Sequence, residues 1–384
     1  MKYDFDTPVD RSGTFSLKWD IKENELPMWV ADMDFRTAPE IISALQKRLD
    51  NGVFGYTVVP DEWSEAYIRW WKTRHGVGYR KEELIFSTGV VPILSSCVRK
   101  LTTEGENVVV MTPVYNAFFS SIKNNGRNVL ECPLDCENNF SIDWDRLEAA
   151  LSDPQTSLML LCNPQNPVGR IWDRDTLARI GELAADNGVT VISDEIHCDI
   201  TDPGAGYVPF ASVSEKCRDN CVVCISPTKA FNLAGLQTAA AVVPNPRLRH
   251  KVWRALNTDE VAEPNAFAVQ AAIAAFSEGG GWLDELREYI FGNKLLVKEY
   301  LEKNLPEIKL VPSDATYLLW LDFGSYGLTS RQLSKSIRRN TGLFLSDGSI
   351  YGNAPHHLRM NIACPRSTVR EGLERLSNAA GMLK

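Results

Sequence analysis

The middle of the chain alternates short, continuous apolar runs with amphipathic stretches, and this alternation limits the possible folds more than any other feature of the sequence. The apolar runs predict strands at 107–111, 157–163, 189–193, 222–225 and 238–243, and the amphipathic stretches predict helices at 115–123 and 173–186. Strands that are apolar on both faces belong to parallel sheets with helices on both sides. We therefore expect an α/β fold with a large domain built on a mostly parallel sheet.

A different pattern begins near Gly279-Gly280-Gly281. A long helix is predicted from Trp282 to about Asn304, followed by a strand at 315–323, a helix at 330–340, a strand at 357–363 and a final helix. We interpret this part as a second, smaller α/β domain with which the N-terminal arm packs. The predicted divisions are 1–48 for the arm and part of the small domain, 49–285 for the large domain and 286–384 for the small C-terminal domain.

Charge and composition argue against several classes of protein. The net charge of −8 at pH 7 argues against a nucleic-acid surface, which normally requires a basic patch. No apolar stretch approaches the roughly 18 residues that a membrane span requires, and the first residues hold no apolar signal segment. The nine cysteines include a C-x-x-C pair, Cys221 and Cys224, but in a strand these side chains point to opposite faces and cannot readily share a metal. We expect reduced cysteines, no metal site and a cytoplasmic protein.

A lysine and an aspartate each follow one of the predicted strands. Lys229 follows the strand at 222–225, and Asp194 follows the strand at 189–193. Each alone has an ordinary explanation, since a lysine can be a solvated charge and an aspartate can cap a turn. At the carboxyl edge of one sheet, however, they can act together. A lysine can form a Schiff base with pyridoxal 5′-phosphate (PLP), and an aspartate can keep the pyridine nitrogen of that cofactor protonated.

Other segments offer polar groups at the same edge. Ser87-Thr-Gly89-Val90-Val91-Pro92 opens a predicted helix, whose unpaired backbone N–H groups can bind a phosphate. Ser226 is placed to give a hydroxyl to the same phosphate. Asn166, in the turn 163–169, is placed to donate to the phenolic oxygen of PLP. Tyr115 can stack on the pyridine ring or simply belong to the core.

These residues resemble one family, the fold-type-I PLP enzymes of the aminotransferase class I/II superfamily, and within it the MalY/PatB group of cystathionine β-lyase-like C–S lyases. The resemblance covers nearly the whole chain. It rests on Pro27-Met-Trp-Val-Ala-Asp-Met-Asp-Phe35, Phe54-Gly-Tyr56-Thr, Ser87–Pro92, Asn163-Pro-Gln-Asn-Pro-Val-Gly169, Ser193-Asp-Glu-Ile-His197, Ser226–Gln237 and Leu358-Arg-Met-Asn-Ile-Ala-Cys-Pro365. It implies a large domain with a mostly parallel seven-stranded sheet sandwiched by helices, beside a smaller α/β domain.

The resemblance also implies a role for each candidate residue. Lys229 is then the Schiff-base lysine and Asp194 the partner of the pyridine nitrogen. Further cofactor contacts are expected from Gly89, Val90, Val91, Tyr115, Asn166, His197 and Ser226. Substrate contacts are expected from Arg359, which would grip the α-carboxylate, and from Asn166, Tyr115 and Trp29. Tyr56 is expected to reach the phosphate in the neighbouring subunit and to take part in catalysis, so we expect a homodimer with shared active sites.

Two positions depart from the aspartate-type aminotransferases. His197 stands where those enzymes carry a tyrosine, and Gln237 stands where they carry a phosphate-binding arginine. Both departures agree with the C–S lyase group. His197 is either a general acid or a packing residue. We therefore expect a PLP-dependent C–S β-lyase that converts L-cystathionine or a related S-substituted cysteine to thiol, pyruvate and ammonia. The alternative is a class I/II aminotransferase that acts on L-amino acids through the same residues.

Overall fold

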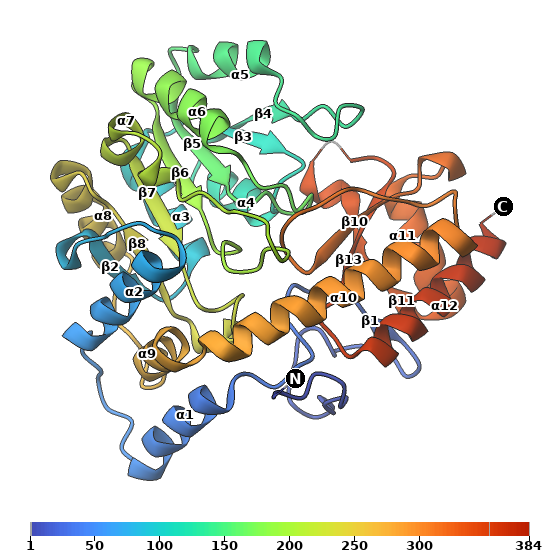
Figure 1. Cartoon of the computed structure of the whole chain (residues 1–384). Coiled ribbons are helices and arrows are strands. Elements are labelled where there is room, and N and C mark those ends of the chain that lie inside the picture. Colours follow the sequence, from blue (N-terminus) through green and yellow to red (C-terminus); the bar gives the residue numbers. More distant parts are fainter. Residues whose placement is uncertain (1, 353, 384) are drawn as a thin grey trace.

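The computed structural model describes residues 2–352 and 354–383, and its large sheet lies on the left in Figure 1, beside the smaller C-terminal part on the right. Among these residues, the seven strands of the large sheet lie in the order β2–β8–β7–β6–β5–β3–β4. Their bounds are Leu84–Ser87 (β2), Asn107–Thr112 (β3), Asn128–Pro133 (β4), Thr156–Cys162 (β5), Thr190–Asp194 (β6), Cys221–Ile225 (β7) and Ala239–Val242 (β8). Strand β8 is antiparallel to both of its neighbours, and the other pairs are parallel. The mostly parallel seven-stranded sheet is thus confirmed.

Helices cover both faces of this sheet. Successive side chains of a strand point to opposite faces, and they therefore pack in two different hydrophobic cores. In β3, Val108 and Val110 pack in one core, while Val109 and Met111 pack in the other. The first core includes helices α3 (Val90–Leu101), α4 (Ala117–Lys123) and α8 (Pro246–Thr258). The second includes α2 (Asp61–Arg74), α5 (Trp144–Leu151), α6 (Arg174–Asp186), α7 (Glu215–Asp219) and α9 (Ala268–Glu278). Burial on both faces explains why the strands read as continuous apolar runs.

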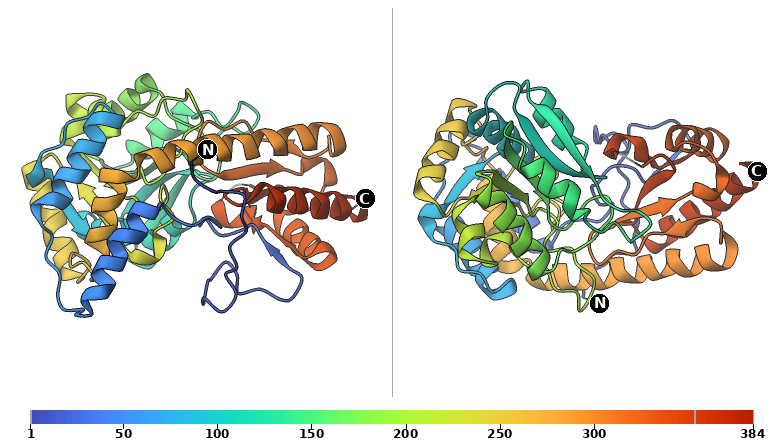
Figure 2. Two further views of the ribbon diagram at one scale, coloured as in Figure 1. Left: turned by 60° about the horizontal axis from the view of Figure 1, so that its bottom comes forward. Right: turned by 90° about the horizontal axis from the view of Figure 1, so that it is seen from above.

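A smaller α/β part follows helix α10 (Gly280–Asn304), which runs from the large sheet along the smaller part (Figure 2). The small sheet has the order β12–β13–β10–β9, and neighbouring strands are antiparallel. Its strands are β9 (Lys309–Leu310), β10 (Leu318–Asp322), β12 (Ser346–Asp347) and β13 (His357–Asn361), and helices α11 (Ser330–Thr341) and α12 (Arg366–Met382) pack with them. Helix α1 (Pro39–Asn51) precedes the large sheet. The predicted domain boundaries at residues 48 and 285 stay a prediction.

The N-terminal segment pairs with the C-terminal part of the chain. Strand β1 (Leu26–Pro27) is parallel to β11 (Leu343–Phe344), and Met28 N–H donates to the carbonyl of Phe344 over 2.9 Å. Residues that follow β1 are thereby carried between the two sheets. This placement brings the N-terminal segment to the site described below.

Several predicted boundaries differ from the structure by one to three residues, and two of these differences have a clear cause. Helix α10 includes Gly280 and Gly281 and continues through Gly292, so the glycines do not break it. Strand β10 starts at Leu318 rather than at Ala315, because Thr316 has a left-handed backbone with φ of 68° that a strand cannot contain.

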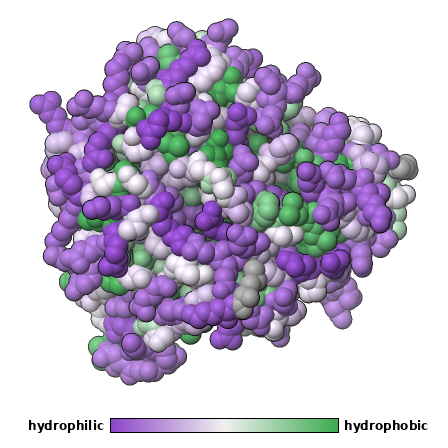
Figure 3. All heavy atoms as spheres, viewed as in Figure 1, coloured by the Kyte–Doolittle hydropathy of each residue, from purple (hydrophilic) through white to green (hydrophobic). Residues whose placement is uncertain are grey.

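The nine cysteines are all free in the described structure, and Cys136 is the exposed one among them. Within the same residues, we find no helix with the length and apolar character needed to cross a membrane. The face of the molecule in Figure 3 is mostly hydrophilic, with apolar residues in small clusters.

Candidate active site

The candidate site is a cavity of about 180 Å³ beyond the carboxyl ends of β5, β6 and β7. Ligands of parallel α/β sheets bind at this edge. Most of the residues predicted for the cofactor line it together, although they come from distant parts of the chain. The lining residues on which the following description depends are Ala31, Gly89, Val90, Val91, Tyr115, Cys162, Asn166, Asp194, His197, Thr228, Lys229 and Gln237.

Lys229 reaches this cavity from the loop that follows β7. Its Nζ donates to the carbonyl oxygen of Ala31 over 2.6 Å. Burial, reinforced by the charge of Arg359, lowers the pKa of Lys229 from 10.5 to about 8, against the opposing charges of Asp32 and Asp194. About a tenth of this amine is therefore neutral at pH 7, far more than for an ordinary lysine. The neutral amine is the form that attacks an aldehyde.

Asp194 ends strand β6 and is only 3% exposed. Its Oδ1 accepts from the backbone N–H of Ile196 over 3.1 Å. Burial raises the pKa of this carboxyl from 3.8 to about 7, and the charge of Lys229 offsets only part of that effect. A buried carboxyl of this kind would be stabilised as a carboxylate by a cationic group placed against it, such as a protonated pyridine nitrogen.

The N-terminus of helix α3 forms another wall of the cavity. Gly89 is the N-cap residue, and in the described structure no side chain caps the helix. Backbone N–H groups in the first turn of a helix lack intrahelical partners and attract anions. Thr228 and Gln237 also line the cavity and offer further polar groups.

Ser226 lies differently from the prediction. It is buried and does not line the cavity; its hydroxyl donates to the carbonyl of Thr238 over 2.7 Å and lies 2.8 Å from the Thr228 hydroxyl oxygen. Ser226 thus holds Thr228, which itself faces the cavity. A direct phosphate contact of Ser226 remains a prediction.

Arg359 lies on β13, is 5% exposed and contacts the cavity residue Asn166 without lining the cavity itself. One terminal nitrogen donates to Asn166 Oδ1 and the other to the carbonyl of Trp29, both over 3.1 Å. The guanidinium also lies over the ring of Tyr351, 4.8 Å from its centroid. Its Nε is buried and has no hydrogen-bond partner among the described residues. A carboxylate would give that nitrogen a partner.

The carbonyl group of Trp29 accepts a hydrogen bond from Arg359, and its ring contacts other residues. The indole stacks on Phe344, with ring centroids 4.7 Å apart, and its Nε1 donates to the carbonyl of Lys18. The predicted substrate contact of the Trp29 side chain is not tested by these contacts and stays a prediction.

Tyr115 and His197 both line the cavity. Burial raises the pKa of Tyr115 and, together with the charges of Lys229 and Arg359, lowers the pKa of His197 well below its usual range. The His197 imidazole is therefore neutral near neutral pH, and its Nδ1 is buried without a partner in the described part of the chain. A neutral imidazole is a poor general acid, so this environment disfavours the acid role that the sequence left open.

Tyr56 does not join the cavity of its own chain. It lies fully exposed, at 104% of the reference area, in the loop between α1 and α2. Other apolar side chains of that loop, Val53, Phe54 and Val58, are also exposed. The predicted reach of Tyr56 into a neighbouring subunit stays a prediction.

The residues of the cavity fit PLP. An amine of lowered pKa, a buried carboxyl and an uncapped helix N-terminus match the aldehyde, the pyridine nitrogen and the phosphate of that cofactor. The sequence analysis gave no role to Ala31, Tyr317 or Asn361, although all three make hydrogen bonds at this site. Ala31 and Asn361 lie within the motifs at 27–35 and 358–365, which could have pointed to them, whereas Tyr317 lies in no quoted motif. The roles stayed hidden because the contacts join residues that lie far apart along the chain.

Comparison with known proteins agrees with this geometry. The sequence model of the family "Aminotransferase class I and II" matches residues 24–376. Cystathionine beta-lyase PatB of Bacillus subtilis (strain 168) is 43% identical over 384 residues, which cover 98% of this chain and 99% of that protein. Protein MalY of Escherichia coli (strain K12) is 34% identical over 387 residues and 98% of each chain.

Solved structures give the same result. The structure of cystalysin from Treponema denticola, which contains a pyridoxal 5′-phosphate cofactor, has a TM-score of 0.96, 34% identity and 100% coverage of both chains. The PLP-bound C–S lyase from Staphylococcus hominis has a TM-score of 0.91, 32% identity and 98% coverage of each chain. The chain therefore belongs to the aminotransferase class I and II family, with the PLP-dependent fold type I, and within that family it is similar to PatB and MalY, the group that its motifs predicted.

Proposed function

We propose that this protein is a PLP-dependent C–S β-lyase. Its substrates would be L-cystathionine or related S-substituted cysteines, and its products a thiol, pyruvate and ammonia. The observation that carries the proposal is that Lys229 and Asp194 line one cavity together with Asn166, whose side chain accepts a hydrogen bond from Arg359. The pKa of Lys229 there is lowered to about 8. The 43% identity to a protein named cystathionine beta-lyase over nearly the full length of both chains supports the reaction type.

Each of these residues would have one part in the reaction. Arg359 would bind the α-carboxylate of the substrate through Nε and a terminal nitrogen, and so orient the Cα–H bond. The Lys229 amine, once free, would remove the α-proton. The bound cofactor would supply an electron sink, which the Asp194 carboxylate would maintain by keeping the pyridine nitrogen protonated.

Elimination then follows from the substrate's own chemistry. As the Cα–H bond breaks, its proton passes to Lys229 and its electron pair is available to form a double bond between Cα and Cβ. The Cβ–S bond breaks, and the sulfur leaves with the bonding pair and takes up a proton to become the thiol. The remaining enamine is hydrolysed by water to pyruvate and ammonia.

A homodimer with shared sites forms the second part of the proposal. The loop 53–59 exposes Val53, Phe54, Tyr56 and Val58, and contiguous apolar exposure of this kind is typical of interaction surfaces. Tyr56 would reach the phosphate group in the partner subunit. The free cysteines of the described structure fit a reducing compartment, so we further propose a cytoplasmic location.

Aminotransfer is the alternative, because the family includes aminotransferases and the same residues would serve. The test uses PLP-loaded protein and L-cystathionine without added 2-oxo acid, with pyruvate and free thiol followed together. Stoichiometric release of both over many turnovers is expected. No release, combined with turnover of other amino acids once a 2-oxo acid is supplied, would replace the lyase by an aminotransferase.

A further inference from the structure

Residues 29–33, here called the strap, lie across the site, and every carbonyl oxygen of the strap accepts a hydrogen bond from a side chain. Arg359 donates to Trp29, Asn361 to both Val30 and Asp32, Lys229 and Tyr317 to Ala31, and Asn232 to Met33. Arg359 and Asn361 belong to β13, and Tyr317 directly precedes β10. The other donors, Lys229 and Asn232, lie in the loop that follows β7. The strap is therefore held both by the loop that carries Lys229 and by residues of the smaller C-terminal part.

Asn361 holds the strap on both sides of the Ala31 carbonyl. Its Nδ2 lies 2.6 Å from the carbonyl oxygens on both sides, those of Val30 and Asp32. Its Oδ1 accepts from the Ala363 N–H over 2.8 Å, so the amide itself is held. Asn361 thus holds the two flanking carbonyls, while the Ala31 carbonyl between them accepts from Lys229 and Tyr317.

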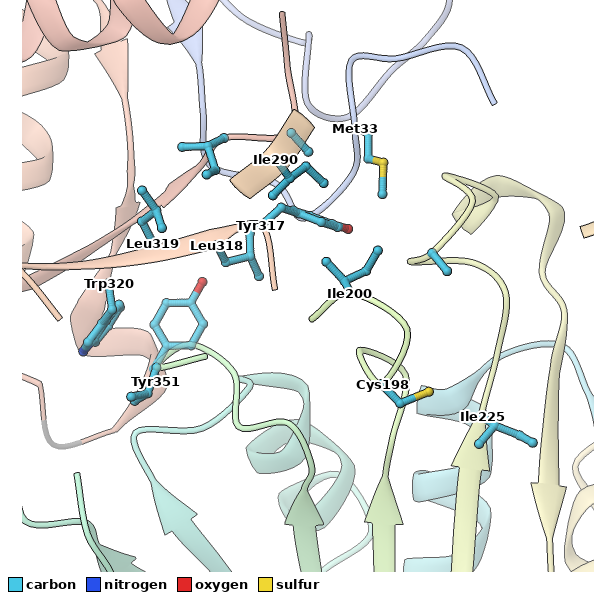
Figure 4. Close-up of a cluster of buried hydrophobic side chains, with 14 of the residues drawn as sticks. Met33, Cys198, Ile200, Ile225, Ile290, Tyr317, Leu318, Leu319, Trp320 and Tyr351 are labelled. Carbon is cyan, nitrogen blue, oxygen red and sulfur yellow. The ribbon is translucent and has the colours of Figure 1, made fainter. Parts of the chain in front are cut away.

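Tyr317 is the second donor to this carbonyl. Its hydroxyl lies 3.0 Å from the Ala31 oxygen, beside the Lys229 Nζ at 2.6 Å. The side chain is 1% exposed, and its ring packs edge-on against His197 with centroids 6.2 Å apart. Figure 4 shows Tyr317 between the segment of Met33 and the loop of Ile200. The backbone N–H of Thr316 donates to the Ile200 carbonyl over 2.7 Å, which fixes this position.

We propose that the Ala31 carbonyl, held by Asn361 and Tyr317, is the acceptor that orients the free Lys229 amine for transfer of the α-proton, which makes Tyr317 and Asn361 positioning residues of the reaction. This inference rests on the proposed function. A neutral amine that donates one N–H to a fixed carbonyl has its lone pair directed elsewhere, here to the substrate side of the cavity. Two donors on one oxygen also weaken its hold on an ammonium form, which favours the neutral base.

The test removes one oxygen atom in the variant Tyr317→Phe, which keeps the ring against His197. The substrate for this test is L-alanine, which has no leaving group on Cβ and cannot undergo elimination. With the PLP-loaded protein in D2O, NMR monitors the exchange of the α-proton of alanine for deuterium. The exchange rate therefore measures proton transfer alone. We expect exchange at saturating alanine to be about three- to tenfold slower, with the alanine concentration for half-maximal rate unchanged.

A second readout needs no cofactor. Competitive acylation of the cofactor-free chain across pH, with peptide mass spectrometry, gives the pKa of Lys229 directly. In Tyr317→Phe the Ala31 carbonyl accepts a hydrogen bond from Lys229 but none from residue 317, so the pKa of Lys229 should rise by about half a unit. The control, Tyr289→Phe, removes a buried hydroxyl of α10 that contacts Asp6 and the Arg366 N–H, and it should change neither the exchange rate nor the lysine pKa.

Exchange in Tyr317→Phe within twofold of the parent would overturn the proposal, and so would an equal loss in the control. Slower exchange with an unchanged Lys229 pKa would also overturn it, because the hydroxyl would then act elsewhere in the site. The lyase proposal fails separately, through absence of pyruvate and thiol from cystathionine. A protein that only transaminates would still exchange the α-proton of alanine, so the two failures can be told apart.

Discussion

The lowered pKa of Lys229 leads to a quantitative prediction about the variant Arg359→Gln. Burial is the main cause that brings this pKa from 10.5 to about 8, and the Arg359 charge is the next. Near pH 7.5, an amine of pKa 8 is about a quarter neutral, whereas an amine of pKa 10.5 is about 0.1% neutral. The site therefore raises the concentration of reactive amine by roughly 200-fold. Removing the Arg359 charge should return part of this shift and make Lys229 more basic.

The assay is the rate at which the cofactor-free chain captures PLP, followed by visible absorbance across pH at a fixed excess of cofactor. In the parent, the rate should rise with pH to a plateau with a midpoint near 8, since only the neutral amine reacts. In Arg359→Gln the midpoint should move to higher pH, and capture near pH 7.5 should slow by the same factor as the neutral fraction falls. The matched control is Arg74→Gln, because Arg74 pairs with Asp284 on the surface and should leave the midpoint unchanged.

Two results would contradict this reasoning. A parent midpoint near 10 would mean that burial does not perturb the amine. An unchanged or lower midpoint in Arg359→Gln would mean that the guanidinium does not act on Lys229 through its charge. In either case, the reactivity of Lys229 near neutral pH would need an explanation other than burial and the charge of Arg359.

Three further predictions concern the cavity. Lys229→Ala should lose the visible absorbance band of the bound cofactor, checked by spectra of the protein after dialysis with PLP; a band of full strength would remove Lys229 from its role. Arg359→Lys should chiefly raise the KM for cystathionine, by about tenfold, because a bidentate carboxylate contact is lost; an unchanged KM would place the carboxylate elsewhere. Burial raises the pKa of Asp194 from 3.8 to about 7 in the folded chain, so the folded state favours the protonated carboxyl. The contribution of this carboxyl to the free energy of unfolding is therefore fully present below pH 3.8 and is lost as the pH rises toward 7. The free energy of unfolding of the cofactor-free protein, measured with denaturant, should thus fall as the pH rises from 5 to 7. In Asp194→Asn this fall should be smaller by up to about 1.4 kcal/mol per pH unit. An equal pH dependence in both proteins would refute this account.

Much of the fold was predictable because each strand of the large sheet is buried on both faces. The runs at 107–111, 157–163 and 222–225 became β3, β5 and β7 with shifts of one residue or less at each end. The carboxyl-edge argument also placed Asp194 and Lys229 at one cavity, since parallel strands end together. Local sequence failed at Thr316, where a left-handed residue delays the start of β10.

The sequence by itself determined the chemistry that this protein can offer: a lysine, a carboxylate and a helix N-terminus at the ends of strands whose apolar residues require a covered parallel sheet. Only the tertiary structure decided how those groups behave. It turned the Ser226 hydroxyl to Thr238, directed the Trp29 indole onto Phe344, and joined Lys229 to a carbonyl 198 residues away. Burial and long-range contacts set the pKa of Lys229 and Asp194, and neither is encoded in the residues next to them, because both depend on which distant segments the fold brings together.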